Sequence, residues 1–380
     1  MERIRNWATL VIFAVILFGL SAAFFVLPDN SRSQAERRLL EQPPEFNVEN
    51  VMNGEYIKKY ETYMQDQFPL RENFRTINAV TRRYGLGQRD HRGYYYAGGH
   101  LSQMEYPLDA EAVRENAAWL NTVIGNLCKD MNVYYAIIPD KNYYLSEKYG
   151  YLAFDCDAML DIVHGQMGKN TYIDLFDVMS LDSFYSTDIH WRQETIFPVV
   201  DRLAENMDFK PLSVDDFTSH TLSPLKGSFL GHSALPVKPD NLIYLTSQYT
   251  EKANVKALIE ENRNFVFSEY LDVDGERLRL GVYNPALFGG MDGYDVFLAG
   301  AQAVITVEIP DAPTDRELII FRDSFGSSIA PLLLGSYSKI TIVDIRYIPS
   351  RLLPNFIEFN NQDVLFLYNT MLLNRSGLLR

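Results

Sequence analysis

Two short stretches of this chain contain residues whose types and order suit a serine-based acyl-transfer site. Ser324 follows an apolar run at 318–321, which predicts a strand buried on both faces, and a short helical pattern then ends at Gly335. In a strand–turn–helix setting, a serine Oγ is displayed at the carboxyl end of a sheet, near the positive end of the helix. Ser324 is therefore a candidate nucleophile, with an ordinary polar turn as the alternative.

The second stretch places a carboxylate and an imidazole two residues apart, as Asp188 and His190. Residues i and i+2 of an extended segment project to the same side, so Asp188 can hold one imidazole nitrogen while the other faces a substrate. This arrangement is the base and orienting half of a serine triad. A single Asp-x-His pair is more often a surface hydrogen bond, but its combination with Ser324 predicts catalysis.

Lys141, Arg346 and Asn369 are further candidates, because each follows a predicted strand. The carboxyl ends of parallel strands meet at one edge of a sheet, where ligand-contacting loops gather. We expect the three side chains to contact substrate or a developing oxyanion there. The alternatives are an exposed loop lysine at position 141 and a surface salt bridge at position 346. The three strands are predicted at 133–138, 340–343 and 364–368.

Alternating strands and helices predict an α/β fold with a mostly parallel sheet and helices on both faces. Apolar residues at steps of three and four indicate a helix at 113–131, and a second helix is expected from Trp191 to Met207. His190 would then lie just before a helix N-terminus. The alternation of strands and helices is interrupted at about 213–300, where short strand-like runs predict a β-rich insertion bordering the site.

The N-terminus contains an apolar run at 8–27, preceded by Arg3 and Arg5. About 20 apolar residues are enough to cross a bilayer, and the basic residues favour a cytoplasmic N-terminus with an exported remainder. A cleaved signal peptide is the alternative, with small residues at 21–23, but the apolar run continues beyond them and favours an anchor. The expected organisation is an anchor at 1–28, a linker and helical lead-in at 29–90, and a main domain at 91–380.

Composition excludes some partners and cofactors. A net charge of −14 over 380 residues disfavours nucleic acid and anionic lipid as partners through bulk electrostatics. Cys128 and Cys156 are the only cysteines, and without histidines at ligand spacing they predict no metal site. They are either free thiols or a disulfide. Gly289 and Gly290 lack the spacing of a phosphate-binding loop, so no cofactor is expected.

The same residues carry a resemblance to a known family. Asp188-Ile189-His190-Trp191, followed far downstream by Asp323-Ser324-Phe325, resembles the DHHW family and its relatives, the alginate O-acetylation proteins with an SGNH-hydrolase-like fold. Ile189 replaces the second residue of the family's name, Arg192 stands where Thr commonly follows, and Arg322 stands where SGNH enzymes often have Gly. Further similar blocks are Phe68-Pro69-Leu70-Arg71, Gly93-Tyr94-Tyr95-Tyr96, Ile138-Pro139-Asp140-Lys141, Leu225-Lys226-Gly227-Ser228 and Val343-Asp344-Ile345-Arg346.

The resemblance implies an SGNH-like three-layer α/β/α domain that is extracytoplasmic and held at the cell membrane by one transmembrane helix. Its implied activity is O-acetylation of an exported or cell-envelope polysaccharide through Ser324, His190 and Asp188, with a membrane-bound O-acyltransferase supplying acetyl groups. It also supports Arg346 as a site residue. The alternatives are a carbohydrate esterase with the same triad and a non-catalytic glycan-binding or scaffold protein.

Overall fold

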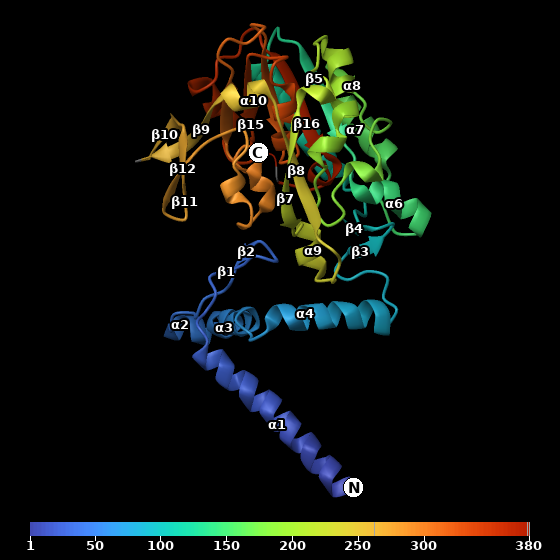
Figure 1. Ribbon diagram of the computed structural model, residues 1–380, viewed down its shortest axis with the longest axis vertical. Coiled ribbons are helices and arrows are strands. Elements are labelled where there is room, and N and C mark those ends of the chain that lie inside the picture. The colour runs from blue at the N-terminus through green and yellow to red at the C-terminus, as the bar shows by residue number, and fades with distance from the viewer. Residues whose placement is uncertain (262, 378, 380) are drawn as a thin grey trace. The chain divides into compact units, whose positions relative to one another are not determined.

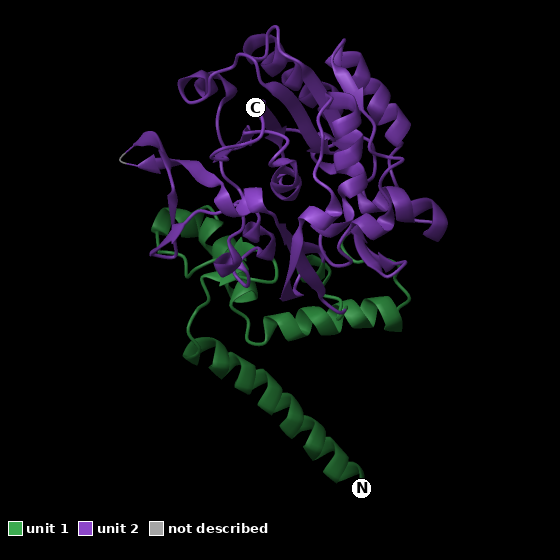
Figure 2. Cartoon of the chain, turned by 45° about the horizontal axis from the view of Figure 1, so that its top comes forward, with its two compact units in different colours: residues 1–92, 230–237 green, residues 93–229, 238–380 purple. Residues whose placement is uncertain are grey.

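The computed structural model describes residues 1–261, 263–377 and 379. The chain forms two compact units, coloured separately in Figure 2. Unit 1 consists of residues 1–92 and 230–237, and unit 2 of residues 93–229 and 238–380.

Unit 2 is built around an eight-stranded sheet with the order β10-β9-β13-β15-β14-β16-β5-β6 (Figure 1). The five strands from β15 to β6 are mutually parallel, whereas β13, β9 and β10 extend the sheet with antiparallel pairings. The strands are β5 Val133–Ile138, β6 Thr171–Ile173, β9 Asn254–Glu261, β10 Asn264–Ser268, β13 Val304–Glu308, β14 Glu317–Arg322, β15 Lys339–Val343 and β16 Asp363–Asn369.

Hydrophobic cores lie on both faces of this sheet because the central strands carry apolar residues on both of their faces. Along β14, Leu318 and Ile320 belong to one core cluster and Ile319 and Phe321 to the other. Helix α8, Phe197–Met207, packs on the first side, and helices α5, Ala110–Leu127, and α7, Cys156–Met167, pack on the second. The predicted α/β fold with a mostly parallel sheet and helices on both faces is confirmed.

The structure corrects the predicted start of the helix after His190. α8 begins at Phe197 rather than at Trp191, with Pro198 in its first turn. Trp191 instead pairs with Phe184 in an isolated β-bridge, and its indole is fully buried. Because this bridge holds an extended backbone, His190 does not lie at a helix N-terminus.

The region 213–300 contains short strands, as predicted, and two of the strands found there, β9 and β10, are part of the main sheet. Two further pairs lie outside it: β7 Thr218–Leu225 with β8 Asp240–Thr246, and β11 Tyr270–Val273 with β12 Glu276–Arg279. The other elements of unit 2 are β3 Tyr94–Ala97, β4 His100–Gln103, α6 Lys141–Tyr149, α10 Gln248–Lys252, α11 Gly326–Ile329 and α12 Thr370–Leu373, and α9 Ser228–Ser233 spans the two units. Short 3-10 turns at 181–183, 193–195, 214–216, 285–287, 293–296, 330–333 and 350–355 complete it.

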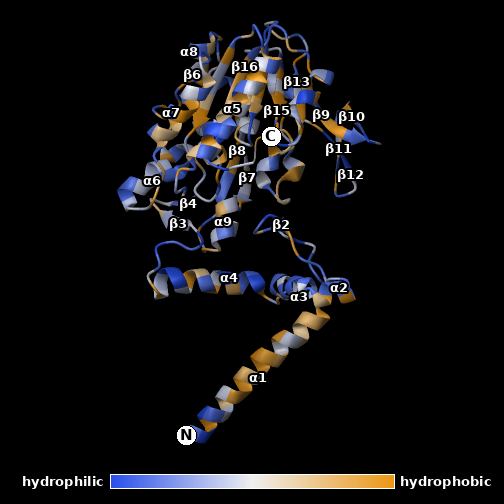
Figure 3. Ribbon diagram, turned by 180° about the vertical axis from the view of Figure 1, so that it is seen from behind, coloured by the Kyte–Doolittle hydropathy of each residue, from blue (hydrophilic) through white to orange (hydrophobic). Residues whose placement is uncertain are grey.

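Unit 1 begins with α1, Glu2–Val26, which is long and apolar enough to cross a membrane (Figure 3). An anchor and a signal sequence share that property. Two longer helices of this unit, α3 and α4, are separated by residues 67–70, which include Pro69. The elements that follow α1 within residues 1–92 are β1 Arg32–Ser33, β2 Arg38–Leu39, α2 Val48–Met52, α3 Glu55–Asp66, α4 Arg71–Val80 and a π-helical turn at Thr81–Gly85.

Candidate active site

Ser324 lies in the turn that follows β14, at the carboxyl edge of the parallel strands. Asp323 fixes this turn: its Oδ1 accepts from Phe325 N at 3.0 Å and its Oδ2 from Asn369 N at 2.7 Å. Burial raises the pKa of the Asp323 carboxyl, while the nearby Arg346 opposes that rise. The bond to Asn369 joins the turn to the end of β16, so the nucleophile candidate is carried by the rigid centre of the sheet.

The structure brings Ser324, His190 and Asp188 together. His190 Nε2 lies 2.7 Å from Ser324 Oγ, and His190 Nδ1 lies 2.6 Å from Asp188 Oδ1. The Asp188 and His190 residues are buried and Ser324 is half-buried, so only the serine end of this chain of bonds meets the surface. Both distances are those of direct hydrogen bonds, and their order suits a nucleophile, a base and an orienting carboxylate.

The second oxygen of Asp188 is held by a neighbouring backbone. Ser228 N donates to Asp188 Oδ2 at 2.6 Å, and His190 N donates to Asp188 Oδ1 at 3.1 Å. Gly227 lies so close to this segment that an added Cβ would meet Thr187 O at 2.2 Å. The Lys-Gly-Ser block of the resemblance thus has a physical role, because only glycine lets Ser228 approach the carboxylate.

Asp240 holds the two residues that precede Asp188, and it is not among the residues predicted from the sequence. Its carboxylate accepts four hydrogen bonds, from Ser186 N at 3.0 Å and Oγ at 2.7 Å, and from Thr187 N at 2.7 Å and Oγ1 at 2.5 Å. Asp240 is the first residue of β8, 52 positions after Asp188. No spacing rule connects the two, so the sequence contained no signal for this contact.

Tyr294 lies against the ring of His190 and was also not predicted. The two rings are parallel to within 5° with centroids 3.8 Å apart. The Tyr294 hydroxyl donates to Ser328 Oγ at 2.6 Å, which fixes the phenol in place, and burial raises its pKa well above the ordinary value. A ring at this distance restricts the imidazole to one plane, which contains the direction to Ser324.

We expect Tyr294→Leu to lower kcat about 30-fold with little change in KM, because an untethered imidazole drifts from the line between Asp188 and Ser324. Tyr294→Phe keeps the ring and should retain kcat within about 3-fold. Steady-state kinetics on an activated acetyl ester measures both. If the two variants lose activity equally, the hydroxyl bond to Ser328 rather than the stacked ring is responsible.

Lys141 is buried and helical, so its alternative interpretation as an exposed loop lysine is wrong. It is the first residue of α6 and is only 2% exposed. Its Nζ donates to Tyr185 O at 3.0 Å and lies 4.7 Å from the centroid of the Phe229 ring. Burial lowers the pKa of Lys141 to about 7, although nearby carboxylates, Asp188 foremost, act in the opposite direction. Lys141 therefore supports the segment that leads to Asp188.

The burial of Lys141 predicts a pH-dependent stability. Its pKa is about 7 in the native state against 10.5 ordinarily, so the unfolded chain binds more protons between those values. The native state should then gain stability relative to Lys141→Met as pH rises from about 7 to about 10, and the cost of burying the cation should be fully present below pH 7. Urea unfolding of both proteins at pH 7 and pH 9.5 measures this difference. A difference that is constant with pH would contradict the low pKa.

Arg346 and Asn369 lie at the same sheet edge as Ser324, and their polar atoms contact the protein. Arg346 Nε and Nη2 donate to the buried Asp344 at 2.8 and 2.6 Å. Asn369 Nδ2 donates to Ile138 O at 3.1 Å, and its Oδ1 accepts from Met371 N at 2.9 Å. Both side chains thus brace the ends of the strands that carry the turn of Ser324.

Solved structures with a similar fold have been found, whereas no protein-family model and no curated protein sequence matches the chain. A DHHW family protein from Eubacterium siraeum is similar over 75% of this chain and 92% of its own, with a TM-score of 0.58 and 18% identity. Bacillus cereus PatB1 matches over 75% and 98%, with a TM-score of 0.57 and 17% identity, and its structure with a sulfonyl adduct gives 0.56. The chain has the fold of a DHHW family protein.

A further match is weaker, and the fold assignment does not depend on it. The O-acetyltransferase domain of Pseudomonas putida AlgJ covers 75% of this chain and 94% of its own, with a TM-score of 0.44 and 15% identity. The DHHW family protein belongs to the family that the sequence motifs resemble, so the resemblance is confirmed at the level of the fold.

Within this DHHW-like fold, Arg322 occupies the position where SGNH enzymes often have glycine. Its side chain is 1% exposed, donates to Gly300 O at 3.1 Å and lies 3.6 Å from Asp344. Gly326 accommodates it, because a Cβ at Gly326 would lie 2.6 Å from the Cβ of Arg322. The turn that displays Ser324 is therefore compatible with an arginine before the Asp-Ser pair. Ile189, another of the three departures, packs against the core.

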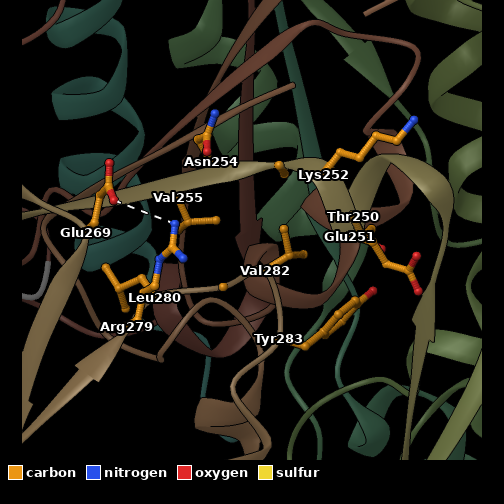
Figure 4. A pocket seen from close by; sticks show the side chains of 12 residues that line it. Thr250, Glu251, Lys252, Asn254, Val255, Glu269, Arg279, Leu280, Val282 and Tyr283 are labelled. Carbon is orange, nitrogen blue, oxygen red and sulfur yellow. Dashed lines mark ion pairs between the residues drawn. The ribbon is translucent and has the colours of Figure 1, made fainter. Parts of the chain in front are cut away.

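Unit 2 also contains a polar pocket of about 450 Å³, and Figure 4 shows the side chains that line it. It is lined by residues of 250–255 and 279–283 together with Glu269, and Arg279 faces Glu269 at 3.9 Å. Ser324, His190 and Asp188 are not part of its lining.

Proposed function

We propose that this protein is an acyl-transfer enzyme in which Ser324 is the nucleophile, His190 the base and Asp188 the orienting carboxylate. The observation that carries this proposal is the unbroken chain of two short hydrogen bonds from Asp188 through His190 to Ser324. The half-buried serine and the buried base and carboxylate suit a substrate that approaches from the serine side.

The reaction follows from these roles. Ser324 Oγ bonds to the carbonyl carbon of an acyl ester while its proton passes to His190 Nε2. When the tetrahedral intermediate collapses, the bond to the donor oxygen breaks and His190 returns the proton to that oxygen. An acceptor hydroxyl then loses its proton to His190 and attacks the acyl carbon. The bond from that carbon to Ser324 Oγ breaks, and His190 returns the proton to Ser324 Oγ. Asp188, which is hydrogen-bonded to His190 Nδ1, stabilises the imidazolium in both half-reactions.

The acceptor that we propose is a hydroxyl of an exported or cell-envelope polysaccharide, with a membrane-bound O-acyltransferase as the source of acetyl groups. Support comes from the sequence resemblance and from the DHHW-like fold. With α1 as an uncleaved anchor and Arg3 and Arg5 inside, unit 2 would lie outside the cytoplasm. Water in place of the sugar hydroxyl gives the esterase alternative with the same residues.

A sulfonyl fluoride that reacts with activated serines tests the nucleophile. We expect one covalent adduct per chain, found by peptide mass spectrometry on Ser324, and no adduct in Ser324→Ala. Ser327→Ala, in helix α11 directly after the turn, is the matched control and should still be labelled. Absence of labelling across the pH range, or equal labelling of Ser324→Ala, would favour the non-catalytic scaffold.

Product analysis then separates the two reactions. An activated acetyl ester is supplied with and without a hydroxyl-bearing oligosaccharide, and the acetylated sugar and free acetate are quantified. A transferase gives acetylated sugar at the expense of acetate, whereas an esterase gives acetate only.

A further inference from the structure

One face of α4 in unit 1 is apolar and exposed to solvent. Leu70, Phe74 and Ile77 follow one another at steps of four and three, and they are 64%, 43% and 59% exposed. Tyr84, in the π-helical turn directly after α4, is 71% exposed. The remaining exposed residues on this side are uncharged: Asn73, Asn78 and Thr81. A soluble protein rarely exposes so continuous an apolar stripe on a helix without a ligand.

The opposite side of α4 is occupied by unit 1 itself, which fixes the direction of the stripe. Arg71 Nη2 contacts Glu36 Oε2 at 2.6 Å, and Arg75 Nη2 lies 3.3 Å from Glu36 Oε1. Arg75 Nη2 also donates to Gly231 O at 2.8 Å. These bonds hold the basic side of the helix inward, so the apolar side cannot rotate into the protein without breaking them.

The stripe begins close to the point where α1 ends. Phe24 packs against Tyr63 with ring centroids 5.5 Å apart, and the Tyr63 hydroxyl lies 3.2 Å from Asp29. Asn30 N donates to Gln67 Oε1 at 2.9 Å, three residues before Leu70. The end of the candidate membrane span is thus tied to the end of α3, and the apolar side of α4 starts within one helical turn of that junction.

Basic residues gather at the far end of the stripe. The segment 81–92, which we call the basic segment, contains four arginines and one aspartate and so has a net charge of +3, whereas the whole chain has −14. Three of these arginines, Arg82, Arg89 and Arg92, line an open hollow of about 610 Å³ together with His91. Burial lowers the pKa of His91, and the adjacent Arg92 and Arg82 lower it further, while Asp90 acts in the opposite direction.

We propose that the apolar face of α4 and the basic segment lie on the surface of a membrane that contains anionic phospholipids, the same membrane that α1 crosses. Apolar residues on one face and arginines beside them are the features of a helix that lies in the interface plane. The arginines of the basic segment contact lipid phosphates, which offsets the repulsion expected from the overall negative charge. This contact goes beyond the acyl-transfer proposal and does not depend on it.

The test uses the full chain in liposomes and an added tryptophan on the stripe. In a Trp7→Phe parent, which keeps Trp119 and Trp191 in unit 2, Phe74→Trp or Ile77→Trp places an indole on the apolar face. We expect brominated phosphatidylcholine in membranes with phosphatidylglycerol to lower the added emission about two-fold or more, because interfacial residues lie near the acyl boundary. Two positions are used so that a folding defect in one does not decide the result.

Charge variants test the lipid class. Arg82→Gln/Arg89→Gln/Arg92→Gln should lose most of this quenching, whereas Lys129→Gln/Lys148→Gln/Lys169→Gln, which removes the same charge from exposed positions of unit 2, should keep it. No added quenching in either indole variant would overturn the membrane contact. Equal quenching with and without phosphatidylglycerol would overturn the assignment of the basic segment to anionic lipid. Protection of the indole only at high protein concentration would assign the stripe to a second copy of the chain.

Discussion

Asp188→Asn is expected to lower kcat/KM for acyl transfer about 10⁴-fold while leaving the fold intact. In the wild-type protein, the Asp188 carboxylate accepts a hydrogen bond from His190 Nδ1 through one oxygen and from Ser228 N through the other. An asparagine amide has only one acceptor oxygen. If that oxygen faces Ser228, the amide nitrogen faces Nδ1, and the imidazole must place its proton on Nε2, where it cannot accept a proton from Ser324. If the amide oxygen faces His190 instead, the amide NH₂ group faces Ser228 N, and these two hydrogen-bond donors cannot pair with each other.

The measurement compares initial rates on an acetyl ester with thermal unfolding of the same variant. Asp174→Asn, in an exposed loop of unit 2, controls for the change of one charge and should keep its rate. Retention of more than about a tenth of the activity in Asp188→Asn would mean that the carboxylate does not orient the base.

Gly227→Ala is expected to destabilise the protein by about 3 kcal/mol and to abolish activity, at the upper end of what overpacking costs. The added methyl group would lie 2.2 Å from Thr187 O and 2.4 Å from Asp188 N, which are backbone atoms. A backbone cannot rotate away as a flexible side chain does, so either the 227–228 segment or the 186–188 segment must move. Either movement breaks the bond between Ser228 N and Asp188.

Gly125→Ala is the matched control for this substitution, because Gly125 lies within α5 and a Cβ there meets no atom within 4 Å. It should stabilise the protein by about 0.5–1 kcal/mol through helix propensity. Denaturant unfolding of the two variants beside the wild type measures both changes. Full activity and native stability in Gly227→Ala would show that the two segments are further apart in solution.

The core of the fold could be predicted because it depends on local patterns. The strands around β14 are continuous apolar runs, and the face that each residue takes follows from their pleat. Ser324, Asp188 and His190 could be found because each stands beside a recognisable element or at a telling spacing. The start of α8 was wrong because the bridge between Phe184 and Trp191 overrides the helical pattern.

The supports of the triad could not be predicted, for a physical reason. Asp240 and Tyr294 reach the site across 52 and 104 positions from Asp188 and His190, and neither has a fixed offset from its partner. The burial of Lys141 could not be predicted either, because nothing near it in the sequence shows that Tyr185 and Phe229 cover it. Contacts of this kind depend on how the connecting segments cross the sheet.

The positions of Tyr294 and Asp240 in the chain also determine which measurement can tell whether a purified preparation has an intact site. Both belong to the polypeptide between 213 and 300, whereas Ser324 is carried by the centre of the sheet. Opening of that polypeptide alone would free the base from its supports while most helices and strands persisted. Far-ultraviolet circular dichroism would then report a native spectrum for a protein whose His190 has lost its supports. A titration of reactive serines is therefore the sounder measure of how much of a preparation is competent.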